Sequence, residues 1–273
     1  MIKLQGVGSR ARLRGVWALL IVAPALPTFA QGPQRDPGAV TVISNAIAAM
    51  GFTTGTAPTS VQLTGSVSPS TGSDDPAGTF TSVVQVSGNG YQVRNDFQYA
   101  SNAMQTNFVA GQKGAAFSFG KRVINMSAHM AMITGPSQLP VFELFRAVNN
   151  SKYQVSQGAP LQIGGVSAVH VKISDETDSV SHAVTPQDWY FDPTSGLPLR
   201  WEFRVPDTFN AMAGSVTTGA KQFSNYQAVN GVLLAMQTTY FRGGQAVSVT
   251  TINSAQLNVP IPVSEFDLPT GGN

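Results

Sequence analysis

Residues 189–203, with the sequence WYFDPTSGLPLRWEF, contain two runs of aromatic and aliphatic residues on either side of a five-residue turn. The turn begins with Asp192, whose side chain can accept hydrogen bonds from backbone N–H groups, and Pro193 fixes φ at the next position. Gly196, at the end of the turn, can take the positive φ that a bulge requires. This pattern predicts a β-hairpin.

The second strand of this hairpin alternates between apolar and charged residues. Its apolar positions are Leu197, Leu199, Trp201, Phe203 and Val205, and its charged positions are Arg200, Glu202 and Arg204. A period of two is typical of a strand with one buried and one hydrated face. The hairpin therefore predicts a sheet that buries its aromatic side.

The first 30 residues have the pattern of a secretory signal peptide. Four basic residues precede a short apolar segment at 16–26, and small residues at Thr28 and Ala30 fit a signal-peptidase site. A membrane span needs about 20 apolar residues, so this segment is too short to be an anchor. We expect cleavage near Ala30 and a periplasmic or secreted protein, with no transmembrane span in the mature chain.

After the signal peptide we expect a flexible arm at 31–38 and one domain at 39–273. The first 30 residues contain four of the 16 basic residues and none of the 14 acidic ones, so the remainder has a formal charge of −2. A basic chain would favour nucleic acid as a partner, and this one is not basic once the signal is removed. The chain has no cysteine, so the domain must be stable without disulfides.

Two amphipathic helices are expected among many strands. Residues 39–50 repeat apolar side chains at helical spacing and are followed by Gly51, and residues 140–148 do the same after Pro140. Elsewhere the period is two and the turns are short, with Asn230-Gly231 the strongest two-residue hairpin signal. Strands that follow strands in this way predict an antiparallel meander with helices on one face.

Four segments resemble the outer-membrane lipoprotein-sorting family, the LolA/LolB-like bacterial periplasmic carriers. The hairpin at 189–203 is similar to the family's W-Y-F-D-x-x-x-G-L-P-L-R segment. The other three are the helix that ends in Ala49-Met50-Gly51, the helix insertion at 139–145, and the stretch from 223–226 through Asn230-Gly231 to 260–262 and 266–269. The resemblance implies a mainly β (α+β) fold, in which two or more helices cover the concave face of a strongly curved antiparallel sheet, an unclosed β-barrel.

Members of this family hold acyl chains or other apolar ligands between the sheet and the helices. By that resemblance, a cavity wall here would be formed by aromatic and methionine side chains, namely Phe142, Phe145, Trp201, Phe203, Met126 and Met132. Concave apolar sites are the usual home of small ligands, and methionine suits pliable pockets. The same side chains could instead be ordinary core, and the sequence leaves both interpretations open.

The sequence contains no recognisable catalytic or metal-binding motif. There is no G-x-S-x-G elbow, and no pair of histidines has the spacing of zinc ligands. His170, which lies between Val169 and Val171, is expected to face solvent from the outer side of a strand. We therefore expect no enzyme activity, no cofactor and no metal.

The leading hypothesis is an exported, non-enzymatic protein that binds a lipid or another apolar ligand, of lipoprotein-carrier type. The alternative is a periplasmic protein-interaction or sensor module of the same fold, whose partner is an envelope protein rather than a lipid. The identity of the ligand or partner and the oligomeric state are not indicated by the sequence.

Overall fold

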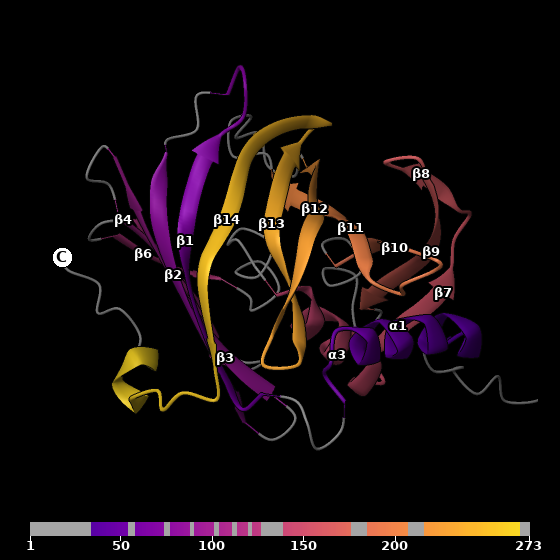
Figure 1. Cartoon of the computed structure of the whole chain (residues 1–273), viewed down its shortest axis with the longest axis horizontal. Coiled ribbons are helices and arrows are strands. Elements are labelled where there is room, and N and C mark those ends of the chain that lie inside the picture. The colour runs from indigo at the N-terminus through magenta and orange to yellow at the C-terminus, as the bar shows by residue number, and fades with distance from the viewer. Residues whose placement is uncertain are drawn as a thin grey trace, which may run out of the picture. The chain divides into compact units, whose positions relative to one another are not determined.

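The computed structural model describes residues 34–53, 58–73, 77–87, 90–100, 104–110, 114–119, 122–126, 139–175, 185–206 and 216–267. Its helices are α1 (Pro37–Ala49), α3 (Pro140–Asn149) and the short η1 (Val263–Phe266). Its strands, labelled in part in Figure 1, are β1 (Ser60–Pro69), β2 (Gly78–Ser87), β3 (Gly90–Tyr99), β4 (Met104–Ala110), β5 (Gly114–Phe119), β6 (Arg122–Met126), β7 (Tyr153–Gln157), β8 (Leu161–Ile163), β9 (Val166–Asp175), β10 (Gln187–Phe191), β11 (Pro198–Pro206), β12 (Val216–Val229), β13 (Val232–Arg242) and β14 (Gln245–Leu257).

These strands form one antiparallel sheet in the order β6-β5-β4-β3-β2-β1-β14-β13-β12-β11-β10-β9-β7, with β8 paired to β9 beside this path. From β1 to β6 and from β9 to β14, strands that follow one another in the chain are neighbours, and β1 pairs with β14 to join these two halves of the sheet. β7 pairs with β9, so β6 and β7 lie at opposite edges. Within the described ranges, β6 and β7 each pair with one strand only, so the sheet is open. The expected mainly β fold, with an open, curved antiparallel sheet and two helices, is confirmed.

The hairpin of β10 and β11 forms as its sequence predicts. Trp189 pairs with Trp201, and a bulge follows at Tyr190 and Phe191. One carboxylate oxygen of Asp192 accepts hydrogen bonds from the backbone N–H groups of Thr194 and Ser195, both at 2.8 Å. Gly196 closes the turn with φ 74°, a left-handed conformation that side chains disfavour.

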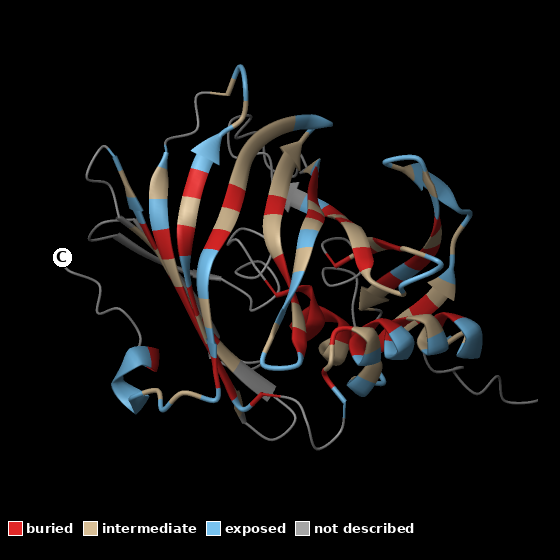
Figure 2. Cartoon of the chain, in the orientation of Figure 1, coloured by how far each residue is buried: buried red, intermediate tan, exposed pale blue. Residues whose placement is uncertain are grey.

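The two faces of the sheet differ in burial, as Figure 2 shows by the alternating bands along the strands. One face, called here the inner face, carries the buried apolar residues that form a single core cluster with α1 and α3. The opposite, outer face carries most of the charged residues of β11 and is covered locally by other segments. Near η1, for example, Phe266 packs on the outer-face residue Val83.

Helix α1 starts two residues earlier than its apolar pattern indicates, because Asp36 and Pro37 form a favourable start. Oδ1 of Asp36 accepts from the backbone N–H groups of Gly38 (2.7 Å) and Ala39 (3.1 Å), and Pro37 occupies the first turn. The expected apolar stripe, which includes Ile43, is buried.

Arg35 precedes α1 and holds the end of α3. Its Nη1 donates to the carbonyl of Asn150 at 2.7 Å, and its Nη2 donates to those of Ala147 at 3.1 Å and Val148 at 2.9 Å. The last carbonyls of a helix lack partners within the helix, so a guanidinium is well placed there. Arg35 falls within the arm expected at 31–38, and it also forms a backbone bridge with Val155 of β7.

Helix α3 begins at Pro140 and ends at Asn149, as expected. Val141 and Leu144 are buried, whereas Phe145 and Val148 of the expected stripe are half-buried against the core. The helix also buries Glu143, which its apolar pattern does not indicate.

The end of α1 is fixed to the β12–β13 turn. Asn230 and Gly231 both have positive φ, 49° and 83°, as a type I′ hairpin requires. The backbone N–H of Leu233 donates to the carbonyl of Met50 at 3.0 Å. A Cβ on Gly51 would lie 2.5 Å from the carbonyl oxygen of Gly231, so only glycine permits this close approach.

Candidate functional site

Aromatic side chains form a continuous layer on the inner face of β10–β13. We call this layer the aromatic wall, and its members are Trp189, Trp201, Phe203, Phe223 and Tyr240. The ring centroids of Trp189 and Trp201 are 5.0 Å apart and nearly parallel, and those of Trp201 and Phe203 are 4.6 Å apart. Phe223 lies 6.4 Å from Trp189, and Tyr240 lies 6.5 Å from Phe203. Each such pair contributes about 0.5–1.5 kcal/mol beyond the burial of its area, so the packing of the rings stabilises the wall.

Lys221 lies within the aromatic wall. It is opposite Trp201 on β11 and opposite Tyr240 on β13, and only 3% of the residue is exposed. Its Nζ lies 5.2 Å from the ring centroid of Trp201 and 5.6 Å from that of Phe203, within the range of cation–π attraction. Burial lowers the pKa of Lys221 to about 7, because the ammonium loses its hydration, and the Glu143 carboxylate opposes that change.

Helix α3 supplies further buried charge to the same interior. Oε2 of Glu143 lies 3.0 Å from Nη2 of Arg146, and both side chains are almost fully buried. Arg146 also lies over the ring of Tyr153. Burial raises the pKa of Tyr153 to about 12. The Glu143 carboxylate acts electrostatically on Lys221, so the charged side of α3 lies within electrostatic reach of the aromatic wall.

Two polar atoms next to Lys221 are buried without a hydrogen-bond partner among the described residues. They are Nε1 of Trp201 and Oγ1 of Thr238. The Nε1 of Trp189, by contrast, donates to Oε1 of Gln187 at 2.8 Å. A buried polar group without a partner costs about 1–3 kcal/mol, so a further hydrogen-bonding group is expected beside these two atoms.

The structure places the predicted site residues in two groups. Trp201 and Phe203 lie in the aromatic wall, whereas Phe142 and Phe145 lie on α3 and both meet Phe52 edge to face, with centroids 6.0 and 6.3 Å apart. Phe52, Phe142, Trp201 and Phe203 belong to one buried cluster against which Phe145 packs.

The two methionines of the predicted wall are not tested by the structure. Met126 ends β6, where only the backbone is described, and Met132 lies outside the described residues.

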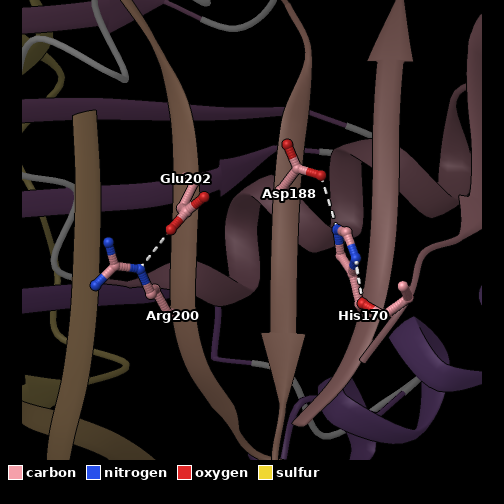
Figure 3. Close-up of polar contacts among 5 residues, drawn as sticks. His170, Asp188, Arg200 and Glu202 are labelled. Carbon is pink, nitrogen blue, oxygen red and sulfur yellow. Dashed lines mark hydrogen bonds and ion pairs between the residues drawn. The ribbon is translucent and has the colours of Figure 1, made fainter. Parts of the chain in front are cut away.

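The sequence pattern predicted that His170 faces solvent, and this prediction is wrong. The residue lies on the outer face, but only 8% of it is exposed, because the segment after β7 folds over it. In Figure 3 its ring lies between Asp188 and a backbone carbonyl: Nε2 is 2.7 Å from Oδ1 of Asp188, and Nδ1 is 2.9 Å from the oxygen of Ala159. Tyr190 stacks on the same ring at 4.6 Å.

Figure 3 also shows Arg200 and Glu202 on β11, paired at 2.7 Å on the same outer face. These groups lie on the side of the sheet away from the aromatic wall. Within the described ranges, no three His, Asp or Glu side chains come together in a way that could hold a metal ion.

Sequence reasoning missed Lys221, Glu143 and Thr238. A signal for Lys221 was present, because it has the same strand parity as Phe223, two positions further on. Paired strands share faces, so a lysine in phase with buried aromatic residues must be buried too.

Comparison with known proteins finds a likeness of fold only. No family model matches the sequence, and no curated protein matches it significantly. A LolA superfamily protein from Nitrosomonas europaea has a TM-score of 0.55 and 14% identity, covering 84% of this chain and 97% of its own. The protein has the LolA-like fold.

Two other solved structures share the LolA-like fold with this chain. A domain from Vibrio parahaemolyticus described as an outer membrane lipoprotein-sorting protein has a TM-score of 0.55 and 15% identity, over 84% of this chain and 96% of its own. A DUF1329 family protein from Desulfovibrio piger has a TM-score of 0.56 and 10% identity, over 86% of this chain and 99% of its own. None of the three is named as an enzyme. No helix in the described part of the chain is long and apolar enough to cross a membrane.

Proposed function

We propose that this protein is an exported, non-enzymatic carrier that binds the acyl chain of a lipid or lipoprotein between α3 and the aromatic wall. In this proposal the signal at 1–30 directs the chain to the periplasm. Phe142 and Phe145 line the helix side of the site, and Trp201 and Phe203 line the sheet side. Met126 and Met132 remain predicted members of the same wall.

The observation that carries this proposal is the aromatic wall on the inner face of an open sheet. An open sheet has no opposite half to cover its inner face, so α1 and α3 must cover it instead. A helix can move away from a sheet more easily than one strand can leave another, since it shares no hydrogen-bonded ladder with it. An apolar chain could then replace part of the helix packing at about 25 cal/mol per Å² of apolar surface buried. The names of two proteins with this fold, a lipoprotein-sorting domain and a LolA superfamily member, are consistent with such a role.

Intrinsic fluorescence offers a direct test. The chain has three tryptophans, and because Trp17 lies in the predicted signal, the mature protein retains only Trp189 and Trp201. Both lie in the aromatic wall. A glycerol monoester of dibromostearate should quench them saturably, because bromine quenches indole at short range, and the unbrominated ester should not.

Two variants sharpen this test. Phe145→Ala shortens a half-buried side chain on the helix side and should weaken binding of the ester. Val263→Ala, at an exposed residue on η1, should leave binding unchanged. Absence of quenching, together with no bound lipid in native mass spectrometry of protein taken from the periplasm, would contradict the proposal. Capture of one envelope protein under those conditions would favour the sensor module instead.

A further inference from the structure

The segment between β7 and β8 lies directly on His170 at the outer face of the sheet. We call this segment, residues 158–160, the strap. The backbone N–H of Gly158 donates to the carbonyl oxygen of His170 at 2.9 Å. A Cβ on Gly158 would overlap the imidazole, so the backbone of the strap packs against the ring with no side chain between them.

Both ring nitrogens of His170 face oxygen atoms that accept hydrogen bonds. Nδ1 lies 2.9 Å from the carbonyl oxygen of Ala159 in the strap, and Nε2 lies 2.7 Å from Oδ1 of Asp188 on β10 (Figure 3). Neither a backbone carbonyl nor an ionised carboxylate has a proton to donate. A neutral imidazole has one N–H and an imidazolium has two, so only the charged ring can donate to both oxygens.

Loss of one proton from His170 would break one of these two links. The nitrogen that loses its proton presents a lone pair to the lone pairs of an oxygen atom, and the ring is too deeply buried for water to replace the bond readily. A carboxylate is a stronger acceptor than a carbonyl, so the remaining N–H should stay on Nε2, facing Asp188. The link that is lost is therefore the one from Nδ1 to Ala159 in the strap.

The groups that face His170 keep their charge over the neutral pH range. Tyr190 stacks on the ring at 4.6 Å, and burial raises the pKa of its hydroxyl to about 12, so it stays neutral. The strap itself, Gly-Ala-Pro, contains no titratable side chain. The charged groups in the same two rows of paired residues are Lys172 on β9, Asp188 on β10, and Arg200 and Glu202 on β11. Side chains of these types ordinarily keep their charge between pH 5.5 and 8.5, where an imidazole changes its own.

We propose that His170 is a pH-dependent latch on the strap. The charged ring fastens the strap to β10 through Ala159 and Asp188, and the neutral ring releases Ala159 and loosens the strap and β8 (Leu161–Ile163), which follows it. This device goes beyond the proposed function, since it requires no ligand. The strap continues β7, whose Val155 pairs with the backbone of Arg35, so the latch acts at the edge of the sheet that supports the end of α3.

Hydrogen exchange followed by NMR at pH 5.5 and pH 8.5 tests the latch, with each rate divided by the intrinsic rate of an unfolded peptide at that pH. The corrected exchange of the amides of Gly158 and β8 should be about tenfold faster at pH 8.5, as the loss of about one hydrogen bond predicts. The amides of Trp201 and Phe223 should show no such increase. At pH 5.5 both ring N–H protons of His170 should be visible, because both are held in hydrogen bonds, and the Nδ1 proton should be lost at pH 8.5.

Two variants separate the latch from other effects of pH. His170→Gln cannot become charged, so strap exchange should no longer depend on pH. Asp188→Asn supplies an amide that can donate to Nε2 of a neutral ring, so Nδ1 can keep its proton on Ala159 and the strap should stay protected at pH 8.5. His129→Gln and His182→Gln, at the other two histidines of the chain, are the controls and should retain the native increase.

Two results would overturn this inference. One is corrected strap exchange that is equal at the two pH values in the native protein, and the other is an increase that persists in His170→Gln or Asp188→Asn. Neither result bears on whether an acyl chain binds at the aromatic wall, so the proposed function is tested separately.

Discussion

Lys221 should make the folded protein less stable than a methionine would at the same position. Burial lowers its pKa from 10.5 to about 7, so the folded state disfavours the proton that the unfolded chain binds readily. One pKa unit corresponds to about 1.4 kcal/mol. Below pH 7, where Lys221 is protonated in both the folded and the unfolded state, its burial therefore lowers the free energy of unfolding by about 5 kcal/mol. Lys221→Met removes the charge, keeps a side chain of similar length, and leaves Glu143 paired with Arg146.

The sign of the pH dependence follows from the same difference. Between pH 7 and 10.5 the unfolded state binds more protons at Lys221 than the folded state, so the stability of the native sequence rises with pH. The advantage of Lys221→Met should therefore be greatest at pH 6. At pH 9 the advantage should be about 3 kcal/mol smaller, because pH 9 lies two units above the pKa of Lys221 in the folded state.

Urea unfolding followed by the fluorescence of Trp189 and Trp201 measures both quantities. Curves for the native sequence, Lys221→Met and the exposed control Lys172→Met would be recorded at pH 6 and pH 9. A Lys221→Met protein that is no more stable than the native one at pH 6, or whose advantage does not shrink by pH 9, would refute the argument that Lys221 is buried and desolvated. If both results are obtained, the protein retains the Lys221 ammonium although it lowers the free energy of unfolding, as is common for residues at binding sites.

Two further predictions concern elements that hold the site in place. Arg35→Ala should lower the free energy of unfolding by about 1.5–3 kcal/mol, because the carbonyls at the end of α3 lose a charged donor, and Arg35→Lys should recover only part of this in the same urea assay. Gly158→Ala should destabilise by about 1–3 kcal/mol, because its Cβ would overlap the imidazole of His170. The double variant with His170→Ala should lose less than the two single effects combined, and simple additivity would contradict this explanation.

Local patterns predicted local structure well. The turn at Asp192–Gly196 and the turn at Asn230-Gly231 each depend on a few adjacent residues with known backbone preferences, and both formed as expected. The apolar stripes of α1 and α3 were recognisable for the same reason. The pairing of β1 with β14 was not predicted, because Val61 and Leu257 are far apart in the chain and nothing in either strand identifies its partner.

The polar part of the site was missed because charge was taken as a sign of exposure. Lys221 and Glu143 are buried because their positions in the strand and helix repeats put them there, and the energy of the surrounding packing outweighs their desolvation. His170 was missed for a different reason. It does lie on the outer face, but a segment from elsewhere in the chain covers it, and a single strand's pattern carries no information about such a cover.

The pairing of β1 with β14 also constrains when the protein can fold. The last strand of the sheet in sequence lies at its middle, between β1 and β13, so the first half of the sheet has no support on that edge until residue 257 is available. Contacts between residues so far apart in sequence make folding slow. Because the central strand is synthesised last, the sheet cannot be completed before the end of β14 is available.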